Sequence, residues 1–345
     1  MPGRAAHPEE GIASDPSEPS SQPSRLGPLT EHARTYEAAG VSLATAEAIV
    51  ERLRAAVQST RTPGVEGAFG TFASLYALDD RRLLAASTDS VGSKLMLARR
   101  AGRLRWAGAD LAAHCINDVL TTGADPLFML DYVAAAQIDQ EQVAQLVEGA
   151  ADVCRAAGCA LVGGETAELP GIYREAELDF AGTCVGLVER DRLVDGTRCS
   201  PGDAVLGFRS SGLHANGFSL VRTLLDDDEE IDAELLLPPT RLYLDEVRAL
   251  RARADVRALA HVTGGGIAGN LVRVLPDGVG ARIDPAGWER PPVYDWLGQR
   301  GVEEEELRRV FNCGIGYCAV VPAADVAAGD VVIGELVEDS GVEWA

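Results

Sequence analysis

The stretch "GADLAAHCINDVL", residues 108–120, decides how this chain folds. It predicts a helix over 108–122 that ends at the stop signals Gly123 and Pro126. Its strongly polar side chains recur at i, i+4, i+7 and i+8 and so share one helix face: Asp110, His114, Asn117 and Asp118. A solvated stripe is the ordinary explanation, but this face lacks Glu, Lys and Arg, and Asp and Asn are poor helix formers. Short carboxylates directed one way from an apolar helix favour a hard cation as ligand.

Strands and helices alternate on both sides of this helix. The apolar spacing predicts strands at 74–78, 83–87, 127–134, 160–162, 179–188, 204–208 and 314–321. It predicts further helices at 46–57, 139–157, 218–225 and 242–251, and another after the glycine turn at 264–266. This mixture is typical of an α/β or α+β fold, and the second half restarts with a strand after a junction near 189–200. We expect an N-terminal domain over 34–189 and a C-terminal domain over 190–345.

Length and composition agree with two domains. A chain of 345 residues exceeds the size of one ordinary core. No apolar stretch reaches about 18 residues, so no membrane-spanning segment is expected. Residues 1–33 are rich in Pro, Ser and Glu, lack the apolar core of a secretory signal and predict a disordered tail. Seven cysteines without a CxxC pair favour reduced thiols in a cytoplasmic protein over a zinc site.

The net charge of −22 limits the class of partner. It argues against nucleic acid and against an anionic membrane surface, because both would repel the chain. A phosphate ligand would need a local source of positive potential, which a divalent cation, backbone N–H groups or a basic side chain supplies. The segment "STDSVGSKL", residues 87–95, offers such a side chain, since Lys94 is the only lysine among the 31 Lys and Arg residues. Chance retention of one surface lysine is the alternative explanation.

Acidic residues follow two of the expected strands, where α/β folds place ligand groups. Asp89 ends one strand-like run and opens a turn with Gly92, and Lys94 follows as a compact charge suited to a phosphate. In "LVGGETAELPG", residues 161–171, Glu165 follows a short strand and a Gly-Gly pair that lets the backbone approach a ligand. A plain turn with solvated glutamates is the other explanation of this second motif.

Two glycine-bearing turns in the second half each carry a histidine. "RSSGLHANGFSLVR", residues 209–222, holds His214 and Asn216, and "HVTGGGIAGN", residues 261–270, holds His261 and Thr263. Such turns offer free backbone N–H groups to an anion, so the two together favour a ligand cleft over two structural histidines. The second turn also fits G-x-G-x-x-G, but no βαβ unit surrounds it, and a dinucleotide-binding fold is not indicated.

Ten stretches, in order along residues 35–321, resemble the phosphoribosylformylglycinamidine cyclo-ligase family. They are "TYEAAGV", "GAFGTF", "STDSVGSKL", "DLAAHCINDVLTTGADPLFMLDY", "LVGGETAELPGIY", "DFAGTCVGLVERDRLVDG", "SSGLHANGFSLVR", "LPPTRLY", "AHVTGGGIAGNLVRVLP" and "FNCGIGYCAVV". Each one alone is a weak signal, but ten in the family's order are highly specific. The resemblance covers nearly the whole chain beyond the tail.

This resemblance implies a two-domain ATP-binding synthetase fold, with an N-terminal domain that forms a homodimer and a C-terminal α/β domain. It implies ATP-dependent ring closure of formylglycinamidine ribonucleotide to aminoimidazole ribonucleotide, ADP and phosphate in purine biosynthesis. ATP phosphorylates the formyl oxygen in this scheme, and an internal nitrogen then attacks the activated carbon. The implied cofactors are ATP and Mg²⁺, and the implied partners are a small ribonucleotide substrate and a second copy of the chain.

The resemblance also assigns roles to individual residues. It implies Mg²⁺ ligands at Asp89, Asp118 and Glu165. It implies contacts to ATP from Gly67, Gly70, Asp89, Lys94, Asn117 and Asp118. It implies substrate contacts from His214, Asn216, Thr263, Gly264, Gly265 and Gly266. Lys94, Asp110 and His261 are the catalytic candidates, with His261 as the proton-transfer group because histidine titrates near neutrality.

The chain departs from the family pattern at Ser87 and Ser90, where glycine is usual, and in a shorter loop before "GAFG". A Cβ at position 90 would cost about 1 kcal/mol if the turn there requires a positive φ. Two other functions therefore stay open. One is a different ATP-dependent kinase or synthetase of the superfamily, and the other is a non-catalytic paralogue that binds ATP.

Overall fold

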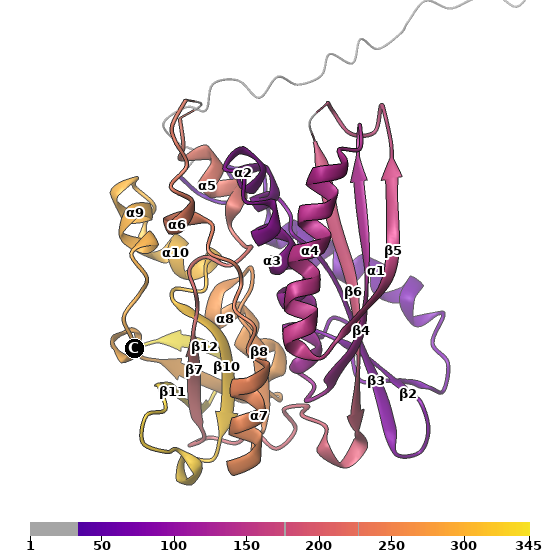
Figure 1. Ribbon diagram of the computed structural model, residues 1–345. Coiled ribbons are helices and arrows are strands. Elements are labelled where there is room, and N and C mark those ends of the chain that lie inside the picture. The colour runs from indigo at the N-terminus through magenta and orange to yellow at the C-terminus, as the bar shows by residue number, and fades with distance from the viewer. Residues whose placement is uncertain (1–33, 176, 227) are drawn as a thin grey trace, which may run out of the picture.

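A computed structural model describes residues 34–345, except residues 176 and 227 and the side chain of residue 47. The predicted disordered tail, residues 1–33, lies outside the described residues. The chain forms two six-stranded sheets with helices packed between and around them (Figure 1). The predicted α/β class is confirmed by this arrangement.

The first sheet has the strand order β1-β2-β3-β6-β4-β5, and only β4 and β5 are parallel neighbours. Its strands are β1 (Val65–Glu66), β2 (Ser74–Ala77), β3 (Arg82–Ser90), β4 (Asp125–Ala135), β5 (Ala160–Glu168) and β6 (Leu178–Glu189). The helices of this half are α1 (Leu43–Gln58), α2 (Lys94–Arg100), α3 (Leu104–Leu120) and α4 (Gln140–Ala157). Figure 1 shows α3 and α4 side by side against one face of the sheet.

The second sheet has the order β12-β9-β11-β7-β10-β8. Its strands are β7 (Ala204–Arg209), β8 (Ala258–His261), β9 (Val279–Ile283), β10 (Ile315–Val321), β11 (Val332–Glu338) and β12 (Gly341–Trp344). The helices around it are α5 (Phe218–Thr223), α6 (Ala233–Leu236), α7 (Leu244–Arg253), α8 (Gly266–Leu271), α9 (Val293–Gln299) and α10 (Glu304–Val310). Short 3₁₀ turns lie at Arg190–Arg192, Val272–Val274, Pro285–Gly287 and Ala323–Asp325.

Local sequence signals account for the ends of the longest helix. Asp139 caps α4 by accepting a hydrogen bond from the Gln142 backbone N–H at 2.9 Å, and Gly158 ends it with φ +66°. α3 crosses α4 where both carry glycine, Gly108 and Gly149. A Cβ on Gly149 would lie 1.9 Å from the Arg105 carbonyl oxygen, so the two helices approach as closely as their backbones allow.

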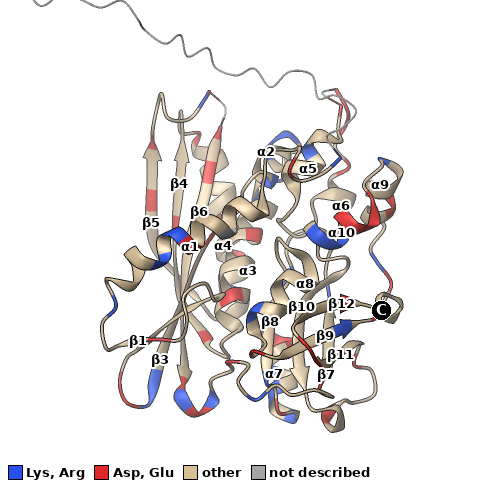
Figure 2. Cartoon of the chain, turned by 180° about the vertical axis from the view of Figure 1, so that it is seen from behind, with Lys and Arg blue, Asp and Glu red and all other residues tan. Residues whose placement is uncertain are grey.

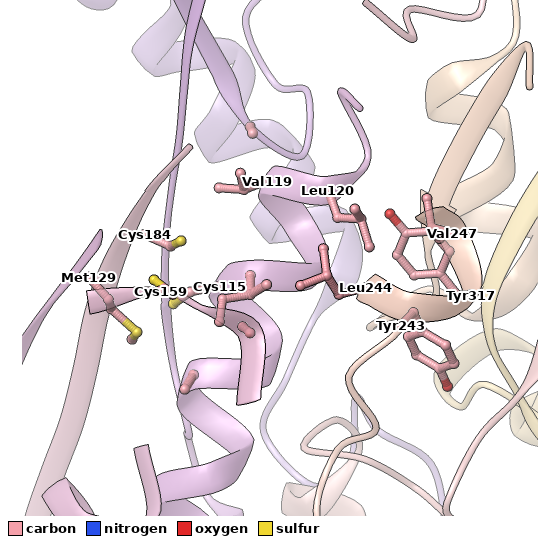
Figure 3. Packing of buried hydrophobic residues seen from close by; sticks show 14 of the residues in the cluster. Cys115, Val119, Leu120, Met129, Cys159, Cys184, Tyr243, Leu244, Val247 and Tyr317 are labelled. Carbon is pink, nitrogen blue, oxygen red and sulfur yellow. The ribbon is translucent and has the colours of Figure 1, made fainter. Parts of the chain in front are cut away.

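One hydrophobic cluster runs without interruption from the first half of the chain into the second. Figure 3 shows Leu120 of α3 facing Leu244 and Val247 of α7 and the ring of Tyr317 from β10. On the other side of α3 the same cluster continues to sulfur-bearing side chains between this helix and the first sheet, among them Cys115 of α3 and Met129 of β4. The two halves are therefore joined by a shared apolar core.

Two predicted strands are longer than the apolar spacing indicated. β3 extends through Asp89 to Ser90, which pairs with Ala181, so neither residue lies in a turn. Ser90 does not have a positive φ, and the expected strain there is absent. β5 continues through the glycine pair to Glu168, because β4 pairs with it along that length after a bulge. Glu165 therefore lies inside a strand and not after it.

The predicted helix at 46–57 forms as α1, but its apolar face points away from the core. Ile49, Val50, Leu53 and Val57 are 40–52% exposed. All seven cysteines are buried and free of disulfide bonds. Within the described residues, no helix is both long enough and apolar enough to cross a bilayer.

Candidate active site

The polar face of α3 lies along the seam between the two halves of the chain, and each of its side chains has a different partner there. Asp110 is fully buried and binds Lys94, which begins α2. Its Oδ1 also accepts hydrogen bonds from the Thr240 backbone N–H and hydroxyl, both at 2.7 Å. Asp110 thus connects two helices of the first half to the segment between α6 and α7 in the second.

Lys94 has no exposed surface, and protein atoms surround its ammonium. The Nζ atom lies 2.7 Å from Asp110 Oδ2 and donates to the Pro238 carbonyl at 3.0 Å. The Phe218 ring lies 5.4 Å from it. Burial lowers the pKa of Lys94, and the carboxylate of Asp110 offsets that effect only in part. The structure gives this lysine a buried ion pair, and its predicted contact with phosphate stays a prediction.

Asn117, also fully buried, holds the same segment of the second half. Its Nδ2 donates to the Arg241 carbonyl at 2.8 Å, and its Oδ1 accepts from the Tyr243 backbone N–H at 3.1 Å. The amide thereby supplies hydrogen-bond partners to two backbone groups just before α7. Asn117 therefore anchors α3 to the second half of the chain. Its predicted contact with ATP stays a prediction.

Asp118 is the carboxylate of α3 that pairs with a histidine of the second half. Its Oδ1 lies 2.8 Å from His261 Nδ1, at the end of β8, and its Oδ2 accepts from the Ser87 hydroxyl at 3.0 Å. Burial lowers the pKa of His261, while Asp118 acts in the opposite direction. Ser87, a departure from the family pattern, is therefore a hydrogen-bond donor to a predicted metal ligand.

Asp89 forms a second carboxylate–imidazole pair, with His114, beside the first. Its Oδ2 lies 3.1 Å from His114 Nδ1, and its side chain is 34% exposed. Burial would raise the pKa of Asp89, but the hydrogen bond and the charge of His114 outweigh it and lower the pKa. Burial by itself would lower the pKa of His114, but Asp89 and the neighbouring carboxylates outweigh burial and raise that pKa. The His114 and His261 rings meet edge to face with centroids 5.0 Å apart.

The turn with His214 and Asn216 lies close to the seam. His214 takes φ +62°, is buried, and places Nε2 3.4 Å from the Tyr243 hydroxyl. Burial lowers the pKa of His214 well below its usual range. His214 Nδ1 and Asn216 Nδ2 are buried without a hydrogen-bond partner. Unpaired polar atoms at the base of a turn are available to a polar ligand.

The second glycine turn is tied down by an asparagine that the sequence reasoning missed. Asn270 Nδ2 donates to the carbonyls of Thr263, Gly264 and Gly266 at 2.8–3.2 Å, and its Oδ1 accepts from the Thr263 hydroxyl. Gly265 and Gly266 have φ +97° and +64°, which explains the glycines. The signal was available, since an Asn four residues after the last glycine of "GGG" lies one helical turn above it.

An arginine joins this turn to the predicted ATP loop. Arg273 donates to Asn270 Oδ1 and to the Gly70 carbonyl, each at 3.2 Å, and its guanidinium lies 3.8 Å from the Phe72 ring centroid. Gly67 and Gly70 have φ +70° and +95°, so the loop conformation requires glycine at both positions. The structure thus brings the 67–70 loop beside the 263–270 turn.

The structure does not bring Glu165 to the other two predicted metal ligands. It lies exposed in β5 at the edge of the sheet, and β6 and β4 separate that strand from Asp89 in β3. Among the described residues no group of three or more His, Cys, Asp or Glu is arranged to hold a metal. Mg²⁺ commonly binds through one or two carboxylates and completes its shell with water and phosphate oxygens. The donor chemistry of Asp89 and Asp118 fits that pattern.

Family models and known proteins agree on what this chain is similar to. The model "AIR synthase related protein, N-terminal domain" matches residues 70–188, and the corresponding C-terminal domain matches residues 200–343. A phosphoribosylformylglycinamidine cyclo-ligase from Sorangium cellulosum is 49% identical over 314 residues, which are 85% of this chain and 90% of that protein. One from Synechococcus sp. is 46% identical over 304 residues, 84% of this chain and 88% of the relative.

Solved structures share the fold at lower identity. A ThiL protein complexed with AMPPCP and TMP is 18% identical with a TM-score of 0.65, over 88% of this chain and 95% of that one. The PurL protein of T. maritima complexed with ADP is also 18% identical, with a TM-score of 0.56 over 81% of this chain and 44% of that one. On the sequence identity to its relatives, the chain belongs to the phosphoribosylformylglycinamidine cyclo-ligase family.

Proposed function

We propose that the chain catalyses ATP-dependent closure of formylglycinamidine ribonucleotide to aminoimidazole ribonucleotide, with release of ADP and phosphate. The observation that carries this proposal is 46–49% identity to cyclo-ligases over 84–85% of the chain. The reaction activates the formyl oxygen by phosphoryl transfer and then closes the ring by attack of an internal nitrogen. Such chemistry relies on positioning and charge stabilisation more than on a covalent protein group.

In this proposal the carboxylates at the seam serve the phosphates of ATP. Asp89 and Asp118 would hold Mg²⁺, which supplies charge neutralisation at the transferring phosphoryl group. Asp89 is suited to this task because part of its carboxylate is exposed while His114 fixes the other oxygen. Gly67 and Gly70 would cover the nucleotide, and Arg273 supports that loop through the Gly70 carbonyl.

The substrate would lie against the two histidine-bearing turns. His214 and Asn216 present buried polar atoms without protein partners, and Thr263 with Gly264–Gly266 forms the second wall. His261 is the proposed proton-transfer group, because Asp118 orients its Nδ1 and its Nε2 has no protein partner. For Lys94 we propose a structural role, since Asp110 and Pro238 already surround its ammonium.

The test is a reaction of the purified chain with formylglycinamidine ribonucleotide and Mg·ATP. We expect aminoimidazole product, measured by its diazo colour, and ADP in a one-to-one ratio. ADP without ring product would contradict the proposal. The superfamily alternative predicts turnover with thiamine phosphate or selenide, and the non-catalytic alternative predicts nucleotide binding without either product. Asp118→Asn is the matched variant, and we expect it to lose both products together.

We also propose that the chain forms a homodimer through its first half. The support is exposed apolar surface on α1 and on the first sheet, including Leu130 at 43% and Val162 at 59% exposure. Exposed apolar surface of this kind commonly marks an interface between proteins. Light scattering should give the mass of a dimer for the native chain, and Val162→Asp should shift it toward a monomer. A monomeric native chain would contradict the proposal, and Val332→Asp, exposed on the second sheet, is the control.

The proposed reaction concerns small phosphorylated intermediates, which supports the predicted cytoplasmic location. ATP use is supported by the fold, since two proteins that share it carry AMPPCP or ADP. Dependence on Mg²⁺ is part of the proposal and follows from the oxygen donors at Asp89 and Asp118. Substituting Ca²⁺ should leave nucleotide bound but slow the turnover, because its looser geometry positions phosphate less well.

A further inference from the structure

Two imidazole–carboxylate pairs stand side by side where the two halves meet. One joins His114 Nδ1 to Asp89 Oδ2 at 3.1 Å, and the other joins His261 Nδ1 to Asp118 Oδ1 at 2.8 Å. The two rings touch edge to face, with centroids 5.0 Å apart. The four side chains therefore form one connected network, Asp89–His114–His261–Asp118, drawn from β3, α3 and β8.

Helix geometry explains how His114 comes to lie inside this network. His114 and Asp118 are four residues apart on α3, so both project from the same face toward the end of β3. His114 is 3% exposed, and its Nε2 has no hydrogen-bond partner. An apolar side chain of similar length would fill the space without leaving a buried polar atom unpaired, so packing alone does not account for an imidazole here.

The hydrogen bond does something specific to Asp89. This carboxylate ends a strand and is 34% exposed, and besides His114 its hydrogen-bond partner is the adjacent Ser90 backbone N–H. Without the imidazole only the Ser90 backbone N–H, which binds Oδ1 at 2.7 Å, would restrain the carboxylate, and Oδ2 would have no protein partner among the described residues. A protein group that fixes one oxygen of a ligating carboxylate orients the other, which is how outer partners tune metal sites.

Electrostatics favour the same arrangement. Asp89 and Asp118 lie near each other, because each binds one of two imidazole rings whose centroids are 5.0 Å apart. Two carboxylates held close together repel one another before a cation arrives. An imidazole hydrogen-bonded to each of them reduces that repulsion, so the pair is assembled in advance.

We propose that His114 is a positioning residue for nucleotide binding, which acts by holding the Asp89 carboxylate in the orientation that receives Mg·ATP. The inference rests on the proposed function, because it takes the seam as the nucleotide site. His261 performs the matching task on Asp118 from the other half of the chain, and the contact between the rings keeps the two carboxylates in register.

The experiment compares His114→Met with His114→Asn. Met fills the space but cannot donate, whereas the Asn amide places an N–H near the position of Nδ1. We expect Met to raise the Kd for Mg·AMPPCP, measured by calorimetry, and the KM for ATP by about 10–100-fold. We expect kcat to change less than threefold and Asn to recover most of the loss. Thr122→Val, whose hydroxyl bonds only the Val119 carbonyl, is the control for general damage to the C-terminal end of α3.

A double-mutant cycle with Asp89→Asn tests whether His114 acts through Asp89. If it does, His114→Met adds little to the loss already caused by Asp89→Asn. Full additivity would overturn the proposal, and so would a Kd for His114→Met within twofold of the native value. Should the Met variant fail to fold, His114→Asn and His114→Leu are compared in its place. A native chain that binds Mg·AMPPCP but makes no ring product contradicts the proposed function and leaves these binding tests decisive.

Discussion

The ammonium of Lys94 is buried in an ion pair with the carboxylate of Asp110. Asp110, the Pro238 carbonyl and the Phe218 ring enclose it, and no part of the side chain reaches solvent. Such a site suits lysine better than arginine, because a planar guanidinium is larger and spreads its donors. The single lysine of the chain is thus explained by the shape of a buried pocket between α2, α3 and the second half.

Removing this ammonium should destabilise the fold strongly. Lys94→Met leaves the Asp110 carboxylate buried without its counter-charge, and we expect a loss of about 3–5 kcal/mol in the free energy of unfolding. Lys94→Met combined with Asp110→Asn should recover part of that loss, because the amide still accepts from Thr240 without a charge. Urea unfolding monitored by fluorescence gives both values. Equal stability of the native chain and Lys94→Met would refute the buried pair.

His214 should make stability depend on pH on the acid side of neutrality. Burial first, and then nearby positive charges, lower its pKa well below the usual value; those charges belong to His114, His261, Lys94 and Arg241. Below about pH 6.5 the unfolded chain binds a proton at this residue that the native chain does not. The free energy of unfolding therefore falls with decreasing pH, by up to about 1.4 kcal/mol per pH unit from this group.

His214→Asn tests that prediction with little change of backbone, because Asn tolerates the φ of +62° found there. Above about pH 6.5 the group should contribute no slope in either protein. The variant should show a shallower loss of stability between about pH 6.5 and pH 5 in thermal unfolding. An unchanged slope would show that other groups carry the acid sensitivity.

The sequence predicted which polar residues of α3 share one helix face, but not the partners that each of them has in the structure. Polarity and helical spacing singled out the face of α3 with Asp110 and Asn117, but could not reveal that residues far along the chain occupy it. Thr240 and Tyr243 contact that face across more than a hundred residues, and no local pattern encodes such a contact. Asp118 and His261 were each singled out from the sequence, but their pairing became visible only in the structure.

Among the elements, the crossing of α3 and α4 sets the position of the site. The helices meet at Gly108 and Gly149, where a Cβ would lie only 1.9–2.0 Å from a carbonyl oxygen of the other helix. Asp110 follows Gly108 by two residues, so the distance between the helices fixes where the polar face stands. The sequence shows these glycines inside helical patterns but not that they face each other.

Gly149→Ala should therefore be costly. The new methyl group would meet the Arg105 carbonyl and push α3 away from α4, and we expect a loss of about 1–3 kcal/mol or more in the free energy of unfolding. Gly298→Ala in α9 is the matched control, since its Cβ would meet nothing within 4 Å. That change should be neutral or should add about 0.5–1 kcal/mol through helix propensity. Equal effects of both changes in urea unfolding would contradict the close crossing.

Element ends and faces were the least predictable features. Apolar spacing found α1 and β5, but α1 exposes its apolar face and β5 runs six residues further than its predicted end at 162. Both features have a tertiary cause. β4 pairs with β5 from Ala160 to Glu168 apart from one bulge, and among the described residues the apolar stripe of α1 stays exposed.

At the scale of the whole molecule, charge is spread over both halves and is dominated by acidic residues. Figure 2 shows Asp and Glu on the strands of the first sheet as well as on the helices of the second half. The sequence carries 53 acidic residues against 31 basic ones, and the resulting charge of −22 repels itself in the compact state. Composition alone predicts this property, and the fold does not cancel it.

Salt should therefore stabilise the protein. Raising KCl from about 0.05 M to about 1 M shortens the screening length from more than 10 Å to about 3 Å and weakens the repulsion. We expect the Tm to rise over that range, and to rise equally in potassium and sodium salts because screening is not ion-specific. Thermal unfolding in matched buffers measures the change. A Tm that falls with added salt would indicate that attractive ion pairs dominate instead.

The network along α3 has a consequence for how the two halves behave when separated. The carboxylates and the amide of this helix find their partners in residues 238–261, and one apolar core spans the same boundary. A fragment that ended before residue 200 would expose a helix face built for a neighbour that is missing. The halves should then melt together as a single cooperative unit, and recombination between relatives would succeed only where both sides of this helix face are exchanged together.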